Sequence, residues 1–168
     1  MRHTIISLSW LGVACLLLSS LPEFAGDQRP SSLVSEQRPI RTLMSHWIAA
    51  YRNLDAKRLA SLEALNVETV DRFGQLHVPS GRNENEKLWS DAFEMVSRNT
   101  VPPSFTVNSI RFVQSDVALV QVICTFPEGI LLVDGERLPS FSQVETFVVT
   151  RRKGVWVIAA HNMQAQMP

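Results

Sequence analysis

The side chains best suited to chemistry in this sequence are Asp71, Glu145 and His161. Each lies in or beside an apolar run, and burial moves the pKa of a carboxylate or an imidazole toward neutral pH, where a general base works best. Tyr51 and Asn162 are candidate neutral donors that would polarise a substrate oxygen. We take Asp71 and His161 as the candidate catalytic residues, with proton transfer as their chemistry.

Aromatic and polar residues are expected to surround this chemistry as the walls of one pocket, together with His77. The predicted ligand-binding residues are Trp47, Tyr51, Arg82, Trp89, Phe93, Glu145 and Asn162. Apolar walls around a few polar groups are typical of small-molecule sites. Trp47, Trp89 and Phe93 occur at helical spacing, so packing in the core is the competing interpretation for these three.

The polar candidates also have structural interpretations. His161 can be a hydrogen-bonded residue of the core or of an interface, and Glu145 can be solvated or paired with an arginine. Asp71 stands three residues before Gly74, a spacing at which an aspartate often organises a turn. Arg82 can form a structural salt bridge with Asp71.

The last thirty residues contain the clearest structural pattern. Residues 141–152 and 155–163 are rich in β-branched and aromatic residues and predict two long antiparallel strands. Residues 153–154 are Lys-Gly, a suitable two-residue connection because glycine tolerates positive φ.

The register of this hairpin decides which polar residues share a face. Pairing outward from the turn places Glu145 opposite Asn162 on one face and Thr146 opposite His161 on the other. The remaining expected pairs are Phe147–Ala160, Val149–Ile158, Arg151–Trp156 and Arg152–Val155. Polar residues at the far end of two apolar strands indicate the mouth of a pocket.

The earlier part of the chain is predicted as helices followed by strands. Apolar residues recur every three or four positions over residues 40–51 and 83–97, which predicts two helices. Between them, a further short helix is predicted to begin after residue 55, with Leu59 and Leu62 facing inward. The other predicted strands are residues 66–73, 75–78, 105–113 and 116–126, and residues 127–139 are expected to form a loop or irregular hairpin. Continuous pairing of 105–113 with 116–126 would set Asn108 opposite Gln121.

Helices at the front and long strands at the back predict an α+β fold, in which N-terminal helices pack on a curved, mainly antiparallel sheet. The strands are apolar on both faces. We therefore expect the helices to cover the inner face of the sheet and a second subunit to cover the outer face.

The N-terminus has the pattern of an export signal. A short basic start precedes an apolar run over residues 5–18, and a helix-breaking segment follows. We expect a signal peptide at 1–26, a Pro- and Ser-bearing linker at 27–38, the folded domain at 39–164 and a tail at 165–168. An uncleaved anchor is the alternative, although the run is shorter than the roughly 20 residues of a membrane span. The mature chain is then periplasmic or secreted, without membrane attachment.

Composition excludes several classes of partner and cofactor. The 168 residues carry sixteen basic and sixteen acidic side chains without a basic stripe, which argues against nucleic acid binding. Cys124 is the one cysteine after the signal and is expected to be a buried apolar residue. The four histidines have no metal-ligand spacing, so no metal is predicted. No glycine-rich dinucleotide fingerprint is present, and no cofactor is expected.

An ordered set of short motifs resembles a known family. The motifs begin with Trp47-Ile-Ala-Ala-Tyr51 and continue through Val70-Asp71, Gly81-Arg82 and Asp116-Val-Ala-Leu-Val120 to Gly154-Val-Trp-Val-Ile-Ala-Ala-His-Asn162. They are similar to the SgcJ/EcaC group of the SnoaL-like, nuclear-transport-factor-two-like superfamily, from about residue 39 to 163. The resemblance implies a cone-shaped α+β barrel around a deep pocket, often as a homodimer packed sheet to sheet. The long leader and residues 128–139 depart from the usual pattern.

Three functions are compatible with these observations. The first is an exported domain that binds a small apolar or amphipathic organic molecule. The second is an enzyme of the isomerase, dehydratase or cyclase kind that uses Asp71 or His161 as its base. The third is a homodimeric assembly module.

Overall fold

The computed structural model describes residues 30–165, with side-chain environments from residue 36 to residue 164. The predicted signal peptide, the first residues of the predicted linker and most of the predicted tail lie outside this range. Within it, the helices are α1 (Pro30–Arg52), α2 (Ala56–Leu62) and α3 (Arg82–Glu94). None of the helices in the described range is long and apolar enough to cross a membrane.

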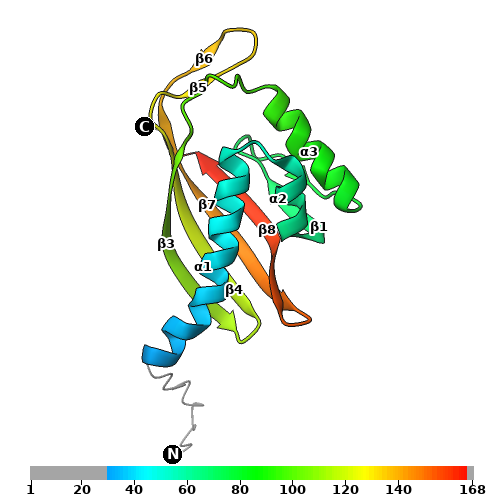
Figure 1. Cartoon of the computed structure of the whole chain (residues 1–168), viewed down its shortest axis with the longest axis vertical. Coiled ribbons are helices and arrows are strands. Elements are labelled where there is room, and N and C mark those ends of the chain that lie inside the picture. Colours follow the sequence, from blue (N-terminus) through cyan, green and yellow to red (C-terminus); the bar gives the residue numbers. More distant parts are fainter. Residues whose placement is uncertain (1–29, 166–168) are drawn as a thin grey trace, which may run out of the picture.

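A six-stranded sheet with the order β2-β1-β8-β7-β4-β3 forms the other layer. Its strands are β1 (Glu63–Val70), β2 (Leu76–His77), β3 (Ser104–Gln114), β4 (Val117–Phe126), β7 (Phe141–Arg152) and β8 (Val155–Ala165). Only β1 and β8 pair in parallel; the other neighbours in this sheet are antiparallel. Figure 1 shows α1 lying along one face of the curved sheet. The predicted α+β class is therefore confirmed.

The predicted irregular hairpin is also present. Strands β5 (Ile130–Leu131) and β6 (Arg137–Leu138) pair as a separate two-stranded sheet. It projects beyond the end of α3 (Figure 1). Leu132 beside it bridges to Val96, just after α3. This small sheet therefore closes the end of the molecule at which α3 finishes.

The predicted β7–β8 register is right near the turn and wrong beyond it. Lys153 and Gly154 both have positive φ, 49° and 82°, as a tight two-residue hairpin requires. Arg152 pairs with Val155, and the expected pairing holds as far as Val149–Ile158. The next pair is Val148–Ala160, because Ala159 forms a β-bulge.

This one-residue bulge changes which face carries which side chain, because side chains alternate along a strand. His161 pairs with Phe147 instead of Thr146, and Glu145 pairs with Met163 instead of Asn162. His161 therefore shares the inner face with Glu145. Asn162 pairs with Thr146 on the opposite face.

A bulge also corrects the predicted β3–β4 register. Val107 pairs with Val122 and Ser109 with Gln121, so Asn108 is the extra residue and does not face Gln121. The pairing arithmetic assumed a continuous ladder, which a bulge interrupts.

Helix α1 begins inside the segment that we predicted as a linker. Pro30 occupies the first helical position, where its fixed φ is favourable and its missing N–H costs nothing. Pro39 lies within α1 and cannot donate to the preceding turn. The Gln37 side chain donates to the Ile110 carbonyl of β3 at 3.3 Å, so this part of the chain packs on the domain.

Trp47 lies at the centre of the core and has no exposed surface. It projects from α1, and five rings from α1, α3 and the sheet surround it. These rings belong to Tyr51, Trp89, Phe105, Phe147 and His161, with centroids 5.0–6.0 Å from that of Trp47. Such aromatic contacts join α1, α3 and the sheet in one core.

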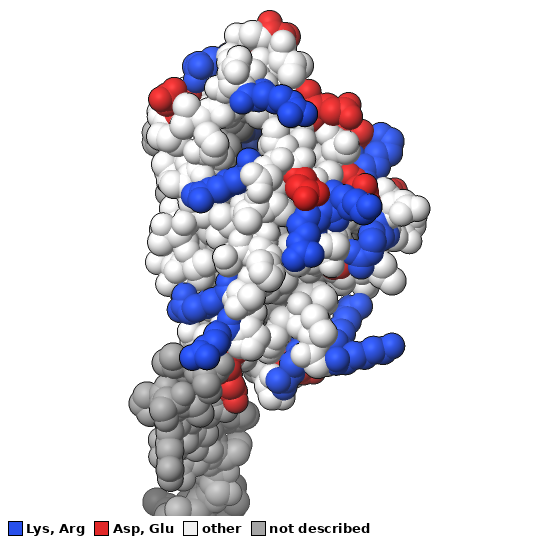
Figure 2. Space-filling model, viewed as in Figure 1, with Lys and Arg blue, Asp and Glu red and all other residues white. Residues whose placement is uncertain are grey.

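The charged side chains of the described surface are mixed. On the face in Figure 2, acidic side chains lie among the basic ones, and uncharged areas separate the groups. This face of the described chain has no continuous basic stripe.

Candidate functional site

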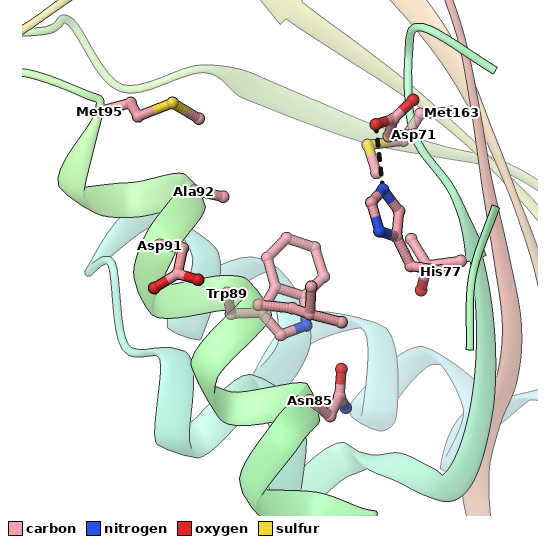
Figure 3. Close-up of a pocket in the computed structure, with 10 residues that line it drawn as sticks. Asp71, His77, Asn85, Trp89, Asp91, Ala92, Met95 and Met163 are labelled. Atoms are coloured by element: carbon pink, nitrogen blue, oxygen red, sulfur yellow. Dashed lines mark hydrogen bonds and ion pairs between the residues drawn. The ribbon is translucent and has the colours of Figure 1, made fainter. Parts of the chain in front are cut away.

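A cavity of about 310 Å³ lies between α3 and the β1–β2 edge of the sheet. Its apolar wall consists of Leu88, Trp89, Ala92, Met95 and Met163. Its polar lining consists of Thr69, Asp71, His77, Asn85 and Asp91. Figure 3 shows α3 on one side and the Asp71–His77 pair facing it across the cavity.

Helical periodicity explains how α3 supplies most of this wall. Asn85, Leu88, Trp89 and Ala92 are three or four residues apart, so they project from one face of the helix. Met95 follows one turn later and is largely exposed at the rim.

Asp71 and His77 come together because β1 and β2 form a tight hairpin. Thr69 pairs with His77 across this hairpin, and Asp71 begins the turn. One oxygen of Asp71, Oδ1, accepts the backbone N–H groups of Phe73 at 2.8 Å and Gln75 at 2.9 Å. The other, Oδ2, lies 3.1 Å from Nε2 of His77. The turn-organising interpretation of Asp71 is thus correct, and the same carboxylate also holds an imidazole.

These contacts favour the charged form of Asp71. Burial raises its pKa, but the hydrogen bonds from the His77 ring and from the Gln75 and Phe73 backbones outweigh burial, so the pKa lies below its ordinary value. Because the Asp71 carboxylate can only accept a hydrogen bond, the proton of the neutral His77 ring lies on Nε2. The lone pair of that ring is then on Nδ1. Figure 3 shows this second nitrogen on the side of the ring that faces Trp89.

Glu63 is a second carboxylate, directly behind the cavity wall and 1% exposed. Its oxygens accept three side-chain N–H groups: Trp47 at 3.2 Å, Asn85 at 2.6 Å and Trp89 at 3.0 Å. A buried carboxylate must find donors, and here α1 and α3 provide them. Glu63 therefore fixes two residues of the cavity, Asn85 and Trp89.

A third carboxylate, Glu145, lies inside the core. His161 Nε2 is 3.0 Å from its Oε2, and Gln143 donates to its Oε1 at 2.7 Å. His161 stacks on Phe147 with ring centroids 4.1 Å apart. Both members of the pair are 1% exposed, and neither lines the cavity.

Two acidic side chains near this buried pair, Tyr51 and Cys124, are kept protonated and uncharged. Burial raises the pKa of the Tyr51 hydroxyl, and the nearby Glu145 raises it further. Burial and then Glu145 also raise the pKa of the Cys124 thiol, which is fully buried as predicted. An uncharged, buried thiol is a poor nucleophile.

No family model matches the chain. No curated protein matches it either. Many solved structures are similar to it in fold. A ketosteroid isomerase-like protein from Erwinia carotovora atroseptica has a TM-score of 0.68 at 14% identity, over 79% of this chain and 98% of that one. The chain has the nuclear-transport-factor-two-like fold.

Two further structures agree with this identification. A nuclear-transport-factor-two-like protein of unknown function from Shewanella oneidensis has a TM-score of 0.58 at 15% identity, over 75% of this chain and 96% of that one. A type 2 hexachlorocyclohexane dehydrochlorinase has a TM-score of 0.64 at 20% identity, over 82% of this chain and 89% of that one. The predicted cone-type α+β barrel is confirmed, and at these identities the likeness concerns the fold.

Within this nuclear-transport-factor-two-like fold, the predicted site residues do not gather in one place. Asp71, His77 and Trp89 line the cavity. Tyr51 and Phe93 line a smaller cavity of about 110 Å³ near the end of α1. Trp47 is in the core, as its structural interpretation proposed.

The remaining predicted residues lie elsewhere. The Arg82 guanidinium donates to the Ala60 carbonyl at the end of α2, so its partner is backbone and not Asp71. Glu145 and His161 pair in the core, and Asn162 faces the other side of the sheet. Glu145, His161 and Asn162 are each outside the lining of the cavity between α3 and the β1–β2 edge.

Sequence reasoning missed Glu63 and Asn85. Asn85 lies four residues before Trp89, so helical spacing from a predicted pocket residue would have found it. Glu63 had no such signal, because its three partners are 16 to 26 residues away in sequence. Across the described residues there is no cluster of three or more His, Cys, Asp or Glu that could hold a metal ion.

Proposed function

We propose that this chain binds a small, largely apolar organic molecule in the cavity between α3 and β1–β2. The observation that carries this proposal is an oriented Asp71–His77 pair on the wall of a largely apolar cavity of about 310 Å³. Pockets of this size with a few convergent polar groups are the usual sites of small ligands.

A proton-abstracting enzyme is the second candidate, and the same pair supports it. Asp71 holds His77 with Nδ1 facing the cavity (Figure 3), which is how a carboxylate orients an imidazole base. The base in this proposal is therefore His77, with Asp71 as its partner. Two of the similar structures, the isomerase-like protein and the dehydrochlorinase, carry names of enzymes.

The chemistry that suits this wall is an elimination. His77 Nδ1 takes a proton from a substrate carbon, and the electron pair of the broken C–H bond forms a double bond as a leaving group departs from the next atom. The resulting imidazolium is paired with the Asp71 carboxylate. Trp89 donates its one indole N–H to Glu63, so that N–H is not available to stabilise an enolate oxygen, and the Asn85 amide directs its nitrogen to the same carboxylate and its oxygen to the cavity (Figure 3).

The base-promoted ring opening of 5-nitrobenzisoxazole tests this chemistry without knowledge of the natural substrate. In that reaction a base removes one C–H proton, the N–O bond breaks and a coloured phenolate forms. We expect wild-type protein to accelerate it by roughly 10²-fold or more, as positioned general bases do.

The variants His77→Gln and Asp71→Asn should return this rate to that of buffer. In the second variant, the amide that replaces the Asp71 carboxylate would donate to Nε2 of His77, which moves the ring proton to Nδ1 and removes the base. If both variants keep the wild-type rate, His77 is not the base. If the wild-type protein binds the probe without acceleration, the chain is a binder and not an enzyme.

The cellular setting is part of the proposal. The basic start and apolar run of residues 1–26 support export to the periplasm or the cell exterior, and the ordered motifs support the SgcJ/EcaC group. We propose a homodimer in which two sheets meet through their outer faces, without nucleic acid or membrane attachment. Native mass spectrometry of the exported protein would give the mass of the assembly and of any bound ligand.

A further inference from the structure

The polar groups of the cavity between α3 and β1–β2 share one property, which is that they accept hydrogen bonds. The two that face the cavity from opposite walls are Nδ1 of His77 and the side-chain oxygen of Asn85 (Figure 3). None of the ten residues that line this described cavity is Lys or Arg. Thr69 is the one hydroxyl, and a hydroxyl can donate or accept.

The orientation of Asn85 follows from its buried partner. Its Nδ2 lies 2.6 Å from Oε2 of Glu63, and a carboxylate can only accept. The reversed amide would place two acceptors in contact, so the amide oxygen must be on the other side. Figure 3 shows it directed toward the cavity.

Glu63 also removes a donor from the cavity. Trp89 donates its indole N–H to Glu63 at 3.0 Å, so it presents only its ring to a ligand. Asp71 has the corresponding effect on the other wall, because it accepts the hydrogen bond of the His77 Nε2–H group and leaves Nδ1 as an acceptor.

The charges behind the two acceptors are negative. Asp71 lies behind His77 and Glu63 behind Asn85. The third nearby carboxylate, Asp91, is paired with Lys87 at 2.7 Å on the exposed side of α3. An anionic ligand would meet carboxylates on both walls and no facing cation, which disfavours it.

We propose that this cavity selects a neutral or cationic molecule that carries a hydroxyl or amino donor on an apolar skeleton, and that it rejects carboxylates. The inference rests on the proposed binding function and adds the class of ligand. Glu63 and Asp71 set the selectivity from behind the wall, because each fixes which atom of its partner faces the ligand.

Three probes of one skeleton test the selectivity: 2-naphthol, 2-methoxynaphthalene and 2-naphthoate. We expect 2-naphthol to bind roughly five- to tenfold more tightly than the methoxy compound, the difference that one hydrogen bond makes. We expect 2-naphthoate to bind most weakly. Dissociation constants come from NMR titration of the full domain.

Variants connect the preference to the named residues. Asn85→Leu and Asp71→Asn each remove one acceptor, and the double variant should bring the 2-naphthol to 2-methoxynaphthalene ratio to about one. Glu63→Leu removes the acceptor that fixes the Asn85 amide, so the amide is free to turn its N–H groups toward the cavity, and should lower the ratio as well, which a mere loss of stability would not do. Asn83→Leu, on the exposed side of the same helix, is the matched control and should keep the wild-type ratio.

The outcomes separate the two proposals. Equal binding of all three probes, or a ratio that the double variant leaves unchanged, overturns the donor selectivity while the binding function stands. If none of the three probes binds, the binding function is overturned and the selectivity with it.

Discussion

Asp71 uses one carboxylate for two purposes. Its Oδ1 closes the β1–β2 turn through the backbone of Phe73 and Gln75, and its Oδ2 holds the ring of His77. The two interpretations of Asp71 in the sequence, a turn former and a residue of the site, therefore hold together.

The lowered pKa of Asp71 predicts a loss of stability in acid. A carboxylate whose folded pKa is below its unfolded pKa stabilises the fold fully above the unfolded pKa, about 3.9 for Asp, and this contribution disappears as pH falls through the folded pKa. The difference in unfolding free energy between wild type and Asp71→Asn should be constant above about pH 5 and shrink below about pH 4. Urea unfolding across this range measures it, and a difference independent of pH would contradict the assignment.

Glu63 should be among the most sensitive residues for stability. Glu63→Ala leaves three buried N–H groups without an acceptor, at about 1–3 kcal/mol each, so we expect a loss of at least roughly 3 kcal/mol. Glu68→Ala, at an exposed position of the same strand, is the control and should change stability by less than about 0.5 kcal/mol. Equal effects of the two substitutions in urea unfolding would argue against the three-donor arrangement.

Among the elements, strands and helices were predicted from their periodicity, and the errors come from bulges. The β7–β8 hairpin follows the expected pairing from Arg152–Val155 to Val149–Ile158. Ala159 then interrupts the ladder. An alanine within a strand gives no sequence signal for a bulge. The consequence of this bulge is large, because it puts His161 on the same face as Glu145, whereas the expected register put the two on opposite faces.

Deletion of Ala159 should remove the bulge and keep the faces of the hairpin. Ile158 and Ala160 then become neighbours, so the pairs Val148–Ala160 and Phe147–His161 are kept and His161 still meets Glu145. Deletion of both Ala159 and Ala160 instead turns His161 to the opposite face and leaves the Glu145 carboxylate buried without its imidazole partner, so we expect a loss of about 3–5 kcal/mol or failure to fold. Thermal unfolding compares the single and the double deletion, and equal effects of the two would contradict the role of the bulge.

The cavity was predictable only in part, for a related reason. Helical spacing and strand ends identified Trp89 and Asp71, both of which line it. Glu145 and His161 were expected there because they are titratable residues in apolar strands. The same residue types also occur inside a core, where they hydrogen-bond each other as they do here. Contacts between residues far apart in sequence, such as Glu63 with Asn85, have no local signature.

For the whole molecule, the outer face of the sheet remains to be accounted for. The middle strand β7 carries Val144 and Val148 on this face, both half-buried in the single chain, with Leu119 of β4 beside Val148. Such a face is suited to a second sheet. It is the surface on which our proposed homodimer depends.

We predict that wild-type protein sediments as a dimer and that Val148→Lys sediments as a monomer, because a lysine there would bury a charge between two sheets. Lys153→Ala, in the exposed β7–β8 turn, should remain dimeric. Sedimentation equilibrium decides the matter, and a monomeric wild type would contradict the sheet-to-sheet dimer.

The central claim, that the cavity between α3 and β1–β2 binds a small organic molecule, is tested most directly by methionine methyl NMR. Met95 and Met163 line this cavity, whereas Met44 is fully buried in α1 and serves as an internal control. On titration with 2-naphthol, the methyl signals of Met95 and Met163 should shift in a saturable way while that of Met44 changes little. Saturable shifts that spare Met95 and Met163, or no shift at all, would contradict the account.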